Sequence, residues 1–384
     1  MPSILYFQQN QAFGSAERYI YDLADSMSYY GFDVHLVCPA DPSMESYHSL
    51  TDRSVTIHWV DNRYYGYNSL LALLYWMRFF RELKPDIVHF NDPCLVGSVA
   101  AYLAGVPHRV MMHHTPEMHR KFNLTGRLFE FLAFRSYTRI IFSNKLSVAN
   151  SMKNDGIPAE KCFVIPFGLN LDWFAPIDER AIAITRHSLN LRNSDIVILC
   201  PARLSRQKRH DLLIEAAQQV TKQVDNAIVL LAGEGELRED IAHLIESTGL
   251  SNRVRMLGHR EDIRAIITAS DLVVLSSDFE GFPYVLMEAA ARGTPAVSTD
   301  VGGVRHSIKD GETGLIVPSG KPAQLATALL SLVIDTKKRQ QFAIAARRHA
   351  EQTFTKEKMV ENTAQFYRSL LIDPNTLSSK KSLV

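Results

Sequence analysis

The chain has 384 residues, of which 46% are hydrophobic and 22% charged, and its 42 basic and 41 acidic side chains leave a net charge of +1. This composition excludes wholesale disorder, and the balanced charge argues against a dedicated nucleic-acid-binding protein. The longest stretch without a charged residue, 93–108, contains glycines and prolines and is too short to span a membrane. The N-terminus has no basic segment before its first apolar run, and the four cysteines lie far apart. We therefore expect no signal peptide and a reduced, cytoplasmic protein.

Short apolar runs alternate with longer helical patterns, such as 15–30 and 69–83, along the whole chain. The strands expected in the first half are 4–7, 34–38, 56–60, 87–90, 109–113, 139–143 and 163–165. Those expected in the second half are 196–200, 227–232, 254–257, 272–276, 296–298 and 314–317. Runs that are apolar throughout and separated by helices are typical of parallel sheets covered on both faces. The sequence therefore predicts an α/β protein with two doubly wound, Rossmann-like domains.

The domain boundary is expected in residues 166–176, which contain two prolines and a glycine and have no periodicity. This gives an N-terminal domain over 1–168 and a second domain over 169–355. Residues 356–384 are predicted to form a helix that packs back on the N-terminal domain, followed by a frayed tail. The polar segment 178–193 suits a surface linker into the second domain.

The most informative segment is 277–290, which follows an expected strand. Pro283 suits the first position of a helix and Gly293 its end, which places Glu280 in the preceding loop and Glu288 within the helix. Two carboxylates beside one helix N-terminus can bind two polyol groups on either side of a phosphate, which backbone N–H groups would hold. The alternative is that Glu288 is a solvated helix residue and Glu280 a favourable charge at a helix end.

Three neighbouring loops favour the ligand-binding interpretation. Arg203 and Lys208 follow the strand 196–200, and a planar and a point cation together suit a diphosphate. Gly233 and Gly235 follow the strand 227–232 and allow a close approach of the backbone. Gly302 and Gly303 follow the strand 296–298, where main-chain N–H groups could surround phosphate oxygens.

With these motifs the chain resembles the retaining glycosyltransferases of family 4, which have the GT-B fold of two Rossmann-like domains facing each other across a cleft and use a nucleotide-diphosphate sugar as donor. The matching features are the Glu280/Glu288 spacing, the Arg203 and Lys208 pair, the two glycine loops and the interdomain run 166–174, in which the family usually has an Asn at position 167. The resemblance extends over nearly the whole chain.

The resemblance implies a role for each motif in the second domain. Arg203 and Lys208 would neutralise the diphosphate leaving group, Glu288 would hold the ribose, and Glu280 would contact the donor sugar near the reacting carbon. Backbone groups around Gly281, Phe282, Pro283 and Val285 would support sugar or phosphate. The loop at His259 and Arg260 would face the base.

The first domain is less clearly marked. Gly14 follows the first strand, in a loop where family members commonly carry two glycines and this chain has Gly14-Ser15. The family typically places a histidine against the donor sugar after a later strand, and His114 fits best, which completes a candidate catalytic set with Arg203, Lys208 and Glu280. His113, His89 and Tyr65 are weaker candidates for the acceptor side, and for His89 a core role is an equal alternative.

No Asp-x-Asp sequence occurs in the chain, so we expect metal-independent transfer with no cofactor. The family is thought to react on one face of the sugar, the departing phosphate helping to deprotonate the acceptor, and retention would follow from that route.

UDP-sugars are favoured as donors, with GDP-sugars next. The acceptor hydroxyl could belong to a glycan, a lipid-linked sugar or a small molecule.

The segment 119–145 carries six basic residues against the single acidic Glu130 and is rich in phenylalanine and leucine. A basic, apolar amphipathic helix can lie on an anionic membrane, here at its inner face. The alternative, which we favour, is a domain helix with its apolar side in the core.

Other enzyme classes and a non-enzyme remain as alternatives. A nicotinamide-dependent dehydrogenase should show G-x-G-x-x-G after its first strand, and neither glycine loop completes that pattern. A GT-B nucleotide-sugar epimerase, or a non-catalytic nucleotide-sugar-binding protein, would share the architecture but accounts less well for the charged set.

Overall fold

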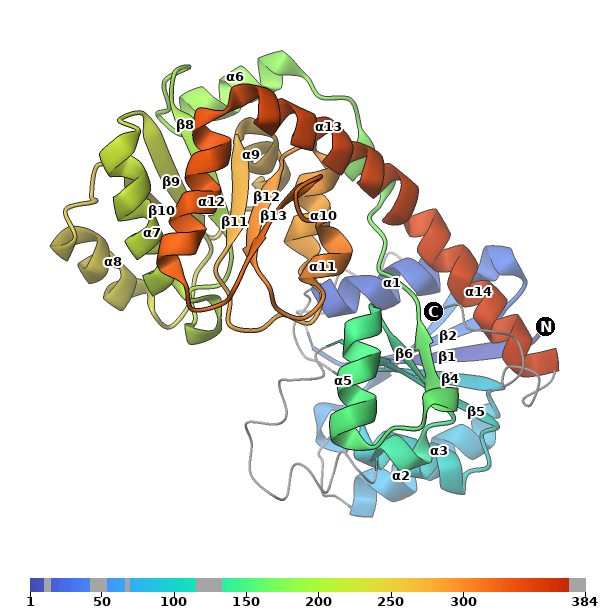
Figure 1. Cartoon of the computed structure of the whole chain (residues 1–384). Coiled ribbons are helices and arrows are strands. Elements are labelled where there is room, and N and C mark those ends of the chain that lie inside the picture. The colour runs from blue at the N-terminus through green and yellow to red at the C-terminus, as the bar shows by residue number, and fades with distance from the viewer. Residues whose placement is uncertain (10–14, 42–53, 66–69, 115–132, 373–384) are drawn as a thin grey trace. The chain divides into compact units, whose positions relative to one another are not determined.

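The computed structural model of the chain describes residues 1–9, 15–41, 54–65, 70–114 and 133–372. The chain divides into two compact units (Figure 1). One consists of Met1–Gly168 together with Lys356–Val384, and the other of Leu169–Thr355. The first unit therefore receives its last helix from the far end of the sequence.

The described part of the first unit contains a seven-stranded parallel sheet in the order β3-β2-β1-β4-β5-β6-β7. The strands are β1 (Ser3–Phe7), β2 (Asp33–Pro39), β3 (Val55–Val60), β4 (Ile87–Asn91), β5 (His108–His113), β6 (Arg139–Phe142) and β7 (Cys162–Val164). In this order β1, β4 and β5 are neighbours at the centre, so the residues that follow these three strands lie close together.

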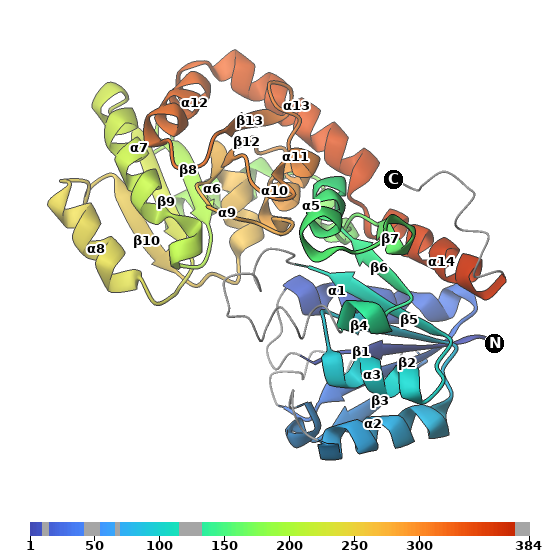
Figure 2. The same cartoon turned by 60° about the horizontal axis from the view of Figure 1, so that its bottom comes forward.

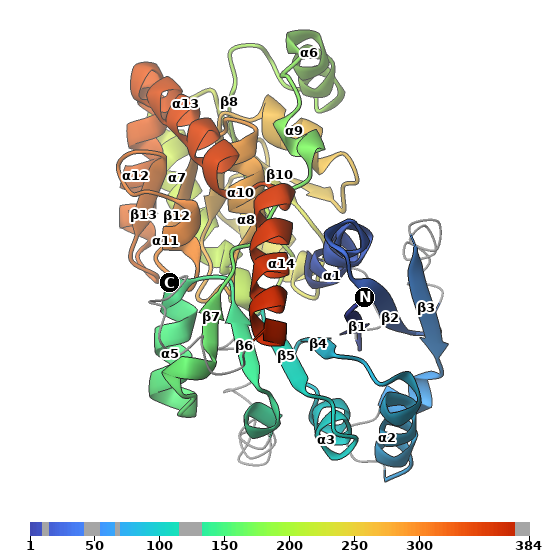
Figure 3. The same ribbon diagram turned by 90° about the vertical axis from the view of Figure 1, so that its right-hand side faces the viewer.

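Helices cover both faces of this sheet (Figures 2 and 3). The helices α2 (Leu70–Leu83) and α3 (Leu95–Leu103) lie on one face, and α1 (Ser15–Met27) and α14 (Lys356–Ile372) on the other, while α5 (Lys145–Asp155) packs beside β6 and β7. Alternate side chains of a strand point to opposite faces. Phe7 therefore joins the core under α2, where its ring centroid lies 4.6 Å from that of Trp76.

The C-terminal helix is fixed to α1 by charge and by burial. Lys356 Nζ donates to Asp25 at 2.8 Å and lies 3.7 Å from Asp22. Tyr367, about three turns further along α14, is fully buried. These contacts explain why α14 belongs to the first unit although the chain reaches it from the second.

The second unit contains a six-stranded parallel sheet in the order β10-β9-β8-β11-β12-β13 among its described residues. The strands are β8 (Ile196–Pro201), β9 (Ala227–Ala232), β10 (Val254–Gly258), β11 (Leu272–Leu275), β12 (Ala296–Thr299) and β13 (Gly314–Val317). The helices are α6 (Glu179–Ser188), α7 (His210–Gln223), α8 (Arg238–Ser247), α9 (Ile263–Ala269), α10 (Tyr284–Ala291), α11 (Val304–Ser307), α12 (Pro322–Ile334) and α13 (Thr336–Thr353). One core lies between the sheet and α7, α8 and α12, and a second between the sheet and α9 and α10 (Figure 1).

The predicted α/β class with parallel sheets is confirmed, and every predicted strand is present with its ends within one residue. The polar segment 178–193 contains α6 over residues 179–188, with Asp178 accepting from Arg180 N as its N-cap and no buried residue in the helix. One local prediction is wrong. Pro283 precedes α10 as its N-cap residue in an extended conformation and is not the first helical residue. In the described ranges we find no helix long and apolar enough to cross a membrane.

Candidate active site

The loops after β8, β9 and β10, together with α10, line one pocket of about 430 Å³ in the second unit. Its lining residues are Pro201, Ala202, Arg203, Ala232, Gly233, Glu234, His259, Arg260, Ile263, Val285 and Glu288. Six of these are residues that the sequence analysis assigned to a donor site: Arg203, Gly233, His259, Arg260, Val285 and Glu288. The carboxyl ends of parallel strands meet at one edge of a sheet, and this is why residues from four separate motifs share one pocket.

The two glycines after β9 hold the loops of this pocket together. Gly233 has a φ of +154°, and a Cβ atom on it would lie 2.1 Å from the carbonyl oxygen of Ala202. A Cβ atom on Gly235 would lie 2.3 Å from the carbonyl oxygen of Leu204. Any side chain at these positions would displace the loop that carries Arg203, so the glycines are required for the close approach of two protein loops.

Lys208 and Glu280 form an ion pair that joins the loops after β8 and β11. Lys208 Nζ donates to Glu280 Oε1 at 2.6 Å, and Ser277 Oγ donates to the same oxygen at 2.5 Å. Glu280 is only 8% exposed, so these donors offset the cost of burying its charge. An ammonium group has three hydrogens, and Lys208 can therefore hold Glu280 and a phosphate oxygen at the same time.

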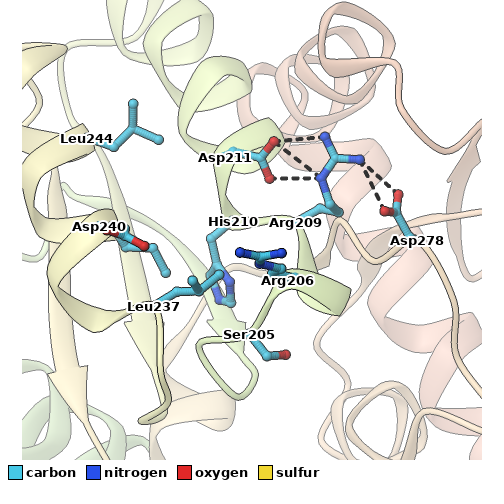
Figure 4. A pocket seen from close by; sticks show the side chains of 10 residues that line it. Ser205, Arg206, Arg209, His210, Asp211, Leu237, Asp240, Leu244 and Asp278 are labelled. Atoms are coloured by element: carbon cyan, nitrogen blue, oxygen red, sulfur yellow. Dashed lines mark hydrogen bonds and ion pairs between the residues drawn. The ribbon is translucent and has the colours of Figure 1, made fainter. Parts of the chain in front are cut away.

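Arg209 clamps the same two loops beside a second pocket of about 430 Å³ (Figure 4). It lies in the left-handed region with a φ of 48°, and its guanidinium donates to Asp211 at 2.8 Å and to Asp278 at 3.0 Å. Figure 4 shows the two carboxylates on either side of the guanidinium. Ser276 Oγ donates to the carbonyl oxygens of Lys208 and Arg209 at 2.8 and 2.9 Å. The backbone that carries Lys208 is therefore fixed before any ligand binds.

The glycine loop after β12 packs directly on the Glu280 loop. Gly302 has a φ of +49°, and a Cβ atom on it would lie 1.6 Å from the carbonyl oxygen of Glu280. The N–H of Gly303 donates to the carbonyl oxygen of Gly281 at 2.9 Å. This N–H is thus engaged by protein backbone, and a phosphate contact through the main-chain N–H groups of this loop stays a prediction. The double glycine supports the loop that presents Glu280.

Of the two further candidates Phe282 and Arg260, the first packs in the core and the second lies on the pocket wall. Phe282 is buried, with its ring centroid 5.5 Å from that of His306 and 6.4 Å from that of Phe354, so its side chain belongs to the core. Arg260 makes two hydrogen bonds to Asp262, at 2.8 and 2.7 Å, and these lower the pKa of the Asp262 carboxyl. Arg260 is held in this way on the wall of the first pocket.

In the first unit, His114 follows β5 and is packed among rings. It is 8% exposed, stacks on Phe167 with 5.3 Å between ring centroids, and lies edge-on to Tyr19 at 5.6 Å. Its Nε2 is 2.6 Å from Asn91 Oδ1. Burial lowers its pKa from 6.5 to about 3, so the imidazole is neutral at neutral pH.

The other candidates of the first unit lie in the core. His89 is fully buried and its Nδ1 bonds to the hydroxyl of Tyr367, while His113 is 2% exposed with its ring beside Phe134 and Phe142. Burial lowers the pKa of His89 to about 3. The ring of Tyr65 packs near Phe7 and Trp76, with centroids 5.9 and 5.5 Å apart. For these three, the structure gives packing roles.

Two predictions fall wholly or partly outside the described residues. Gly14 is one, and the basic segment 119–145 is described only from residue 133. Residues 139–142 form strand β6 with Ile140, Ile141 and Phe142 fully buried, so a single amphipathic helix over 119–145 is wrong. Phe134 is also buried, as the core alternative expects. Contact of this segment with a membrane stays a prediction.

Three residues that hold the loops of the site in place were not among the predicted site residues. Ser277, Arg209 and Asp278 were not assigned roles, although Ser277 and Asp278 directly follow an expected strand, which is a usable signal.

Among residues for which the structure gives positions, no group of three His, Cys, Asp or Glu side chains could hold a metal ion.

Family models match both halves of the chain. The model of Glycosyl transferases group 1 matches residues 182–349, and that of Glycosyltransferase Family 4 matches residues 16–173. Among solved structures, HepE of Anabaena in complex with UDP and glucose is 25% identical, with a TM-score of 0.83 over 96% of this chain and all of that one. A sucrose-phosphate synthase of Thermosynechococcus elongatus, 20% identical, has the same fold, with a TM-score of 0.80 over 97% of this chain and 99% of that one.

Curated relatives carry glycosyltransferase names. The UDP-Gal:alpha-D-GlcNAc-diphosphoundecaprenol alpha-1,3-galactosyltransferase of Escherichia coli is 26% identical over 79% of this chain and 81% of its own length. The D-inositol 3-phosphate glycosyltransferase of Corynebacterium diphtheriae is 33% identical over 49% of this chain, and the match spans 46% of that protein. With two family models on successive halves, these relatives and a GT-B architecture, the chain belongs to the group 1, family 4 glycosyltransferases and is a transferase enzyme.

Proposed function

We propose that the chain transfers a hexose from a UDP-sugar to a hydroxyl acceptor, with retention of anomeric configuration and without a metal ion. The observation that carries the proposal is the pocket in which Arg203, Gly233, Arg260 and Glu288 come together from four loops and helices. A carboxylate suits ribose hydroxyls and a guanidinium suits a diphosphate. A pocket with both, at the carboxyl ends of a doubly wound sheet, fits a nucleoside diphosphate.

The choice of UDP is supported by two similar proteins. HepE of Anabaena was crystallised in complex with UDP-glucose, and the Escherichia coli relative is named for a UDP-Gal donor. The latter is also named for an acceptor sugar carried on a lipid diphosphate, and a glycan or lipid-linked hydroxyl is therefore the acceptor class we propose to test first.

The geometry around Glu280 supports transfer on one face of the sugar. Its Oε1 accepts from both Lys208 and Ser277, so this oxygen holds Lys208 in place and is a weaker nucleophile than an oxygen without donors. In the proposed step the bond between the anomeric carbon and the diphosphate oxygen breaks as the acceptor oxygen bonds to that carbon. The acceptor proton passes to the departing phosphate oxygen. Lys208 and Arg203 stabilise the negative charge that grows on UDP.

The test uses the purified full chain with UDP-glucose, UDP-galactose or GDP-mannose, and measures release of the free nucleotide with and without a polyprenyl-diphosphate-linked N-acetylglucosamine. We expect UDP release that the acceptor accelerates and that EDTA leaves unchanged. Activity that EDTA abolishes and manganese restores would refute metal independence, and preference for GDP-mannose would refute the nucleotide. Isomerisation of the sugar without acceptor would indicate an epimerase, and binding without any release a non-catalytic protein.

A further inference from the structure

Four buried polar side chains form a row of hydrogen bonds across the carboxyl ends of the three central strands of the first unit. Glu17 lies on α1, Gln8 follows β1, Asn91 ends β4 and His114 follows β5. Gln8 Nε2 donates to Glu17 Oε1 at 3.2 Å, and Asn91 Nδ2 donates to Gln8 Oε1 at 2.6 Å. His114 Nε2 then lies 2.6 Å from Asn91 Oδ1. All four are at most 8% exposed.

The carboxylate of Glu17 determines which partner donates in each hydrogen bond of this row. An ionised Glu17 can only accept, so Gln8 must turn its NH₂ group toward Glu17 and its oxygen toward Asn91. That oxygen in turn can only accept, so Asn91 must point its NH₂ group at Gln8 and its oxygen at His114. The remaining partner of an amide oxygen has to be a donor, and His114 Nε2 therefore carries a hydrogen. Reversing either amide would place two acceptors or two donors face to face in a buried site.

We propose that Glu17, Gln8 and Asn91 form a relay that holds His114 as the neutral tautomer with its hydrogen on Nε2, which leaves Nδ1 as a hydrogen-bond acceptor. Glu17, Gln8 and Asn91 are positioning residues, because they act through His114. Burial lowers the pKa of His114 to about 3, which agrees with a neutral ring. A histidine in this state accepts a hydroxyl hydrogen at Nδ1, as a sugar hydroxyl can supply.

The packing around the ring reinforces this arrangement. Phe167 is nearly parallel to the imidazole, with 9° between the planes, and Tyr19 stands edge-on to it. The two rings restrict rotation of His114 about its Cβ–Cγ bond and so fix the position of Nδ1. The relay fixes which ring nitrogen carries the hydrogen. That Nδ1 receives a hydroxyl of the donor sugar rests on the proposed function.

Nitrogen-15 NMR of the histidine rings in the full chain tests the tautomer directly, because a ring nitrogen with and without hydrogen resonates at well-separated frequencies. The His114 signals are assigned by their loss in His114→Gln. We expect wild-type His114 to be protonated at Nε2 alone. In Glu17→Gln, which removes the group that can only accept, we expect the shifts of both ring nitrogens to move toward those of a tautomer mixture. Asp22→Asn removes another buried carboxylate of α1 outside the relay and should leave the His114 signals unchanged.

A hydrogen on Nδ1 in the wild type, or unchanged shifts in a folded Glu17→Gln, would overturn the relay. The wild-type spectrum decides the question even if Glu17→Gln does not fold. For the role in transfer, Glu17→Gln should lower kcat/KM for a UDP-sugar about tenfold, the value of one hydrogen bond, and leave the affinity for UDP unchanged. Wild-type protein that consumes no nucleotide sugar would refute the proposed function, while the NMR result would still decide the relay.

Discussion

At the scale of single residues, the ion pair of Lys208 and Glu280 is the feature that links structure to chemistry most closely. Glu280 is nearly buried and accepts from both Lys208 and Ser277, so its charge and the position of the ammonium group depend on each other. The side chain of Lys208 is 19% exposed, so it can also contact a ligand. One carboxylate thus places the cation that would stabilise the leaving group.

We expect Lys208→Met to lower kcat by a factor of about 10² to 10³, since it removes a charge from the developing transition state. It should also lower the free energy of unfolding, because Glu280 would keep a buried charge without its cation. The double variant Lys208→Met/Glu280→Gln should regain stability without regaining turnover. Steady-state kinetics and denaturant unfolding measure the two effects.

The matched control is Lys222→Met, which removes an exposed lysine of α7 in the same unit. It should change neither quantity. A Lys208→Met enzyme with near wild-type kcat would contradict the role assigned to this residue.

At the scale of elements, the sequence was sufficient for the strands and for the edge of the sheet at which the site lies. A buried parallel strand is a continuous apolar run, and the charged residues and glycines that end the run come just after it, as Arg203 follows β8 and Gly233 follows β9. The helix α6 was harder to predict because none of its residues is buried, so it lacks an apolar face that would mark it. Arg139 was counted with the basic segment 119–145, although the strand predicted at 139–143 already contains it.

What the sequence could not show is contact between loops that are distant in the chain. Arg209 and Asp278 are 69 residues apart, and Gln8 and Asn91 are 83 residues apart. Each pair meets because the strand order places its loops side by side, and no local pattern contains that information. For the same reason the sequence did not show that the N–H of Gly303 donates to the carbonyl oxygen of Gly281 on another loop.

At the scale of the whole molecule, buried neutral histidines in both units predict a loss of stability in mild acid. Burial lowers the pKa of His89 and His114 to about 3 and that of His210 and His306 to about 4. Below pH 6.5 the unfolded chain takes up protons at these sites that the folded chain does not. Each histidine therefore reduces the free energy of unfolding by about 1.4 kcal/mol per pH unit as the pH falls from about 6.5 toward its folded pKa.

Thermal unfolding of the full chain between pH 8 and pH 5 measures this effect. We expect a Tm that is nearly constant above pH 7 and falls below pH 6.5, with a shallower fall in His306→Phe, whose new ring would pack between Phe282 and Phe354. His243→Phe, at an exposed position of α8, should keep the wild-type slope. A Tm that does not change between pH 6.5 and pH 5 would contradict the prediction.

We propose that the pocket at Arg203 and Glu288 binds the nucleotide of the donor, and calorimetric titration of the full chain with UDP measures this binding. We expect binding of one UDP per chain. Glu288→Ala should weaken it about 10- to 100-fold through loss of a charge-assisted hydrogen bond to the ribose. Glu246→Ala, at an exposed site of α8, should bind like the wild type. No binding of UDP to the wild type, or equal affinity in Glu288→Ala, would contradict the claim.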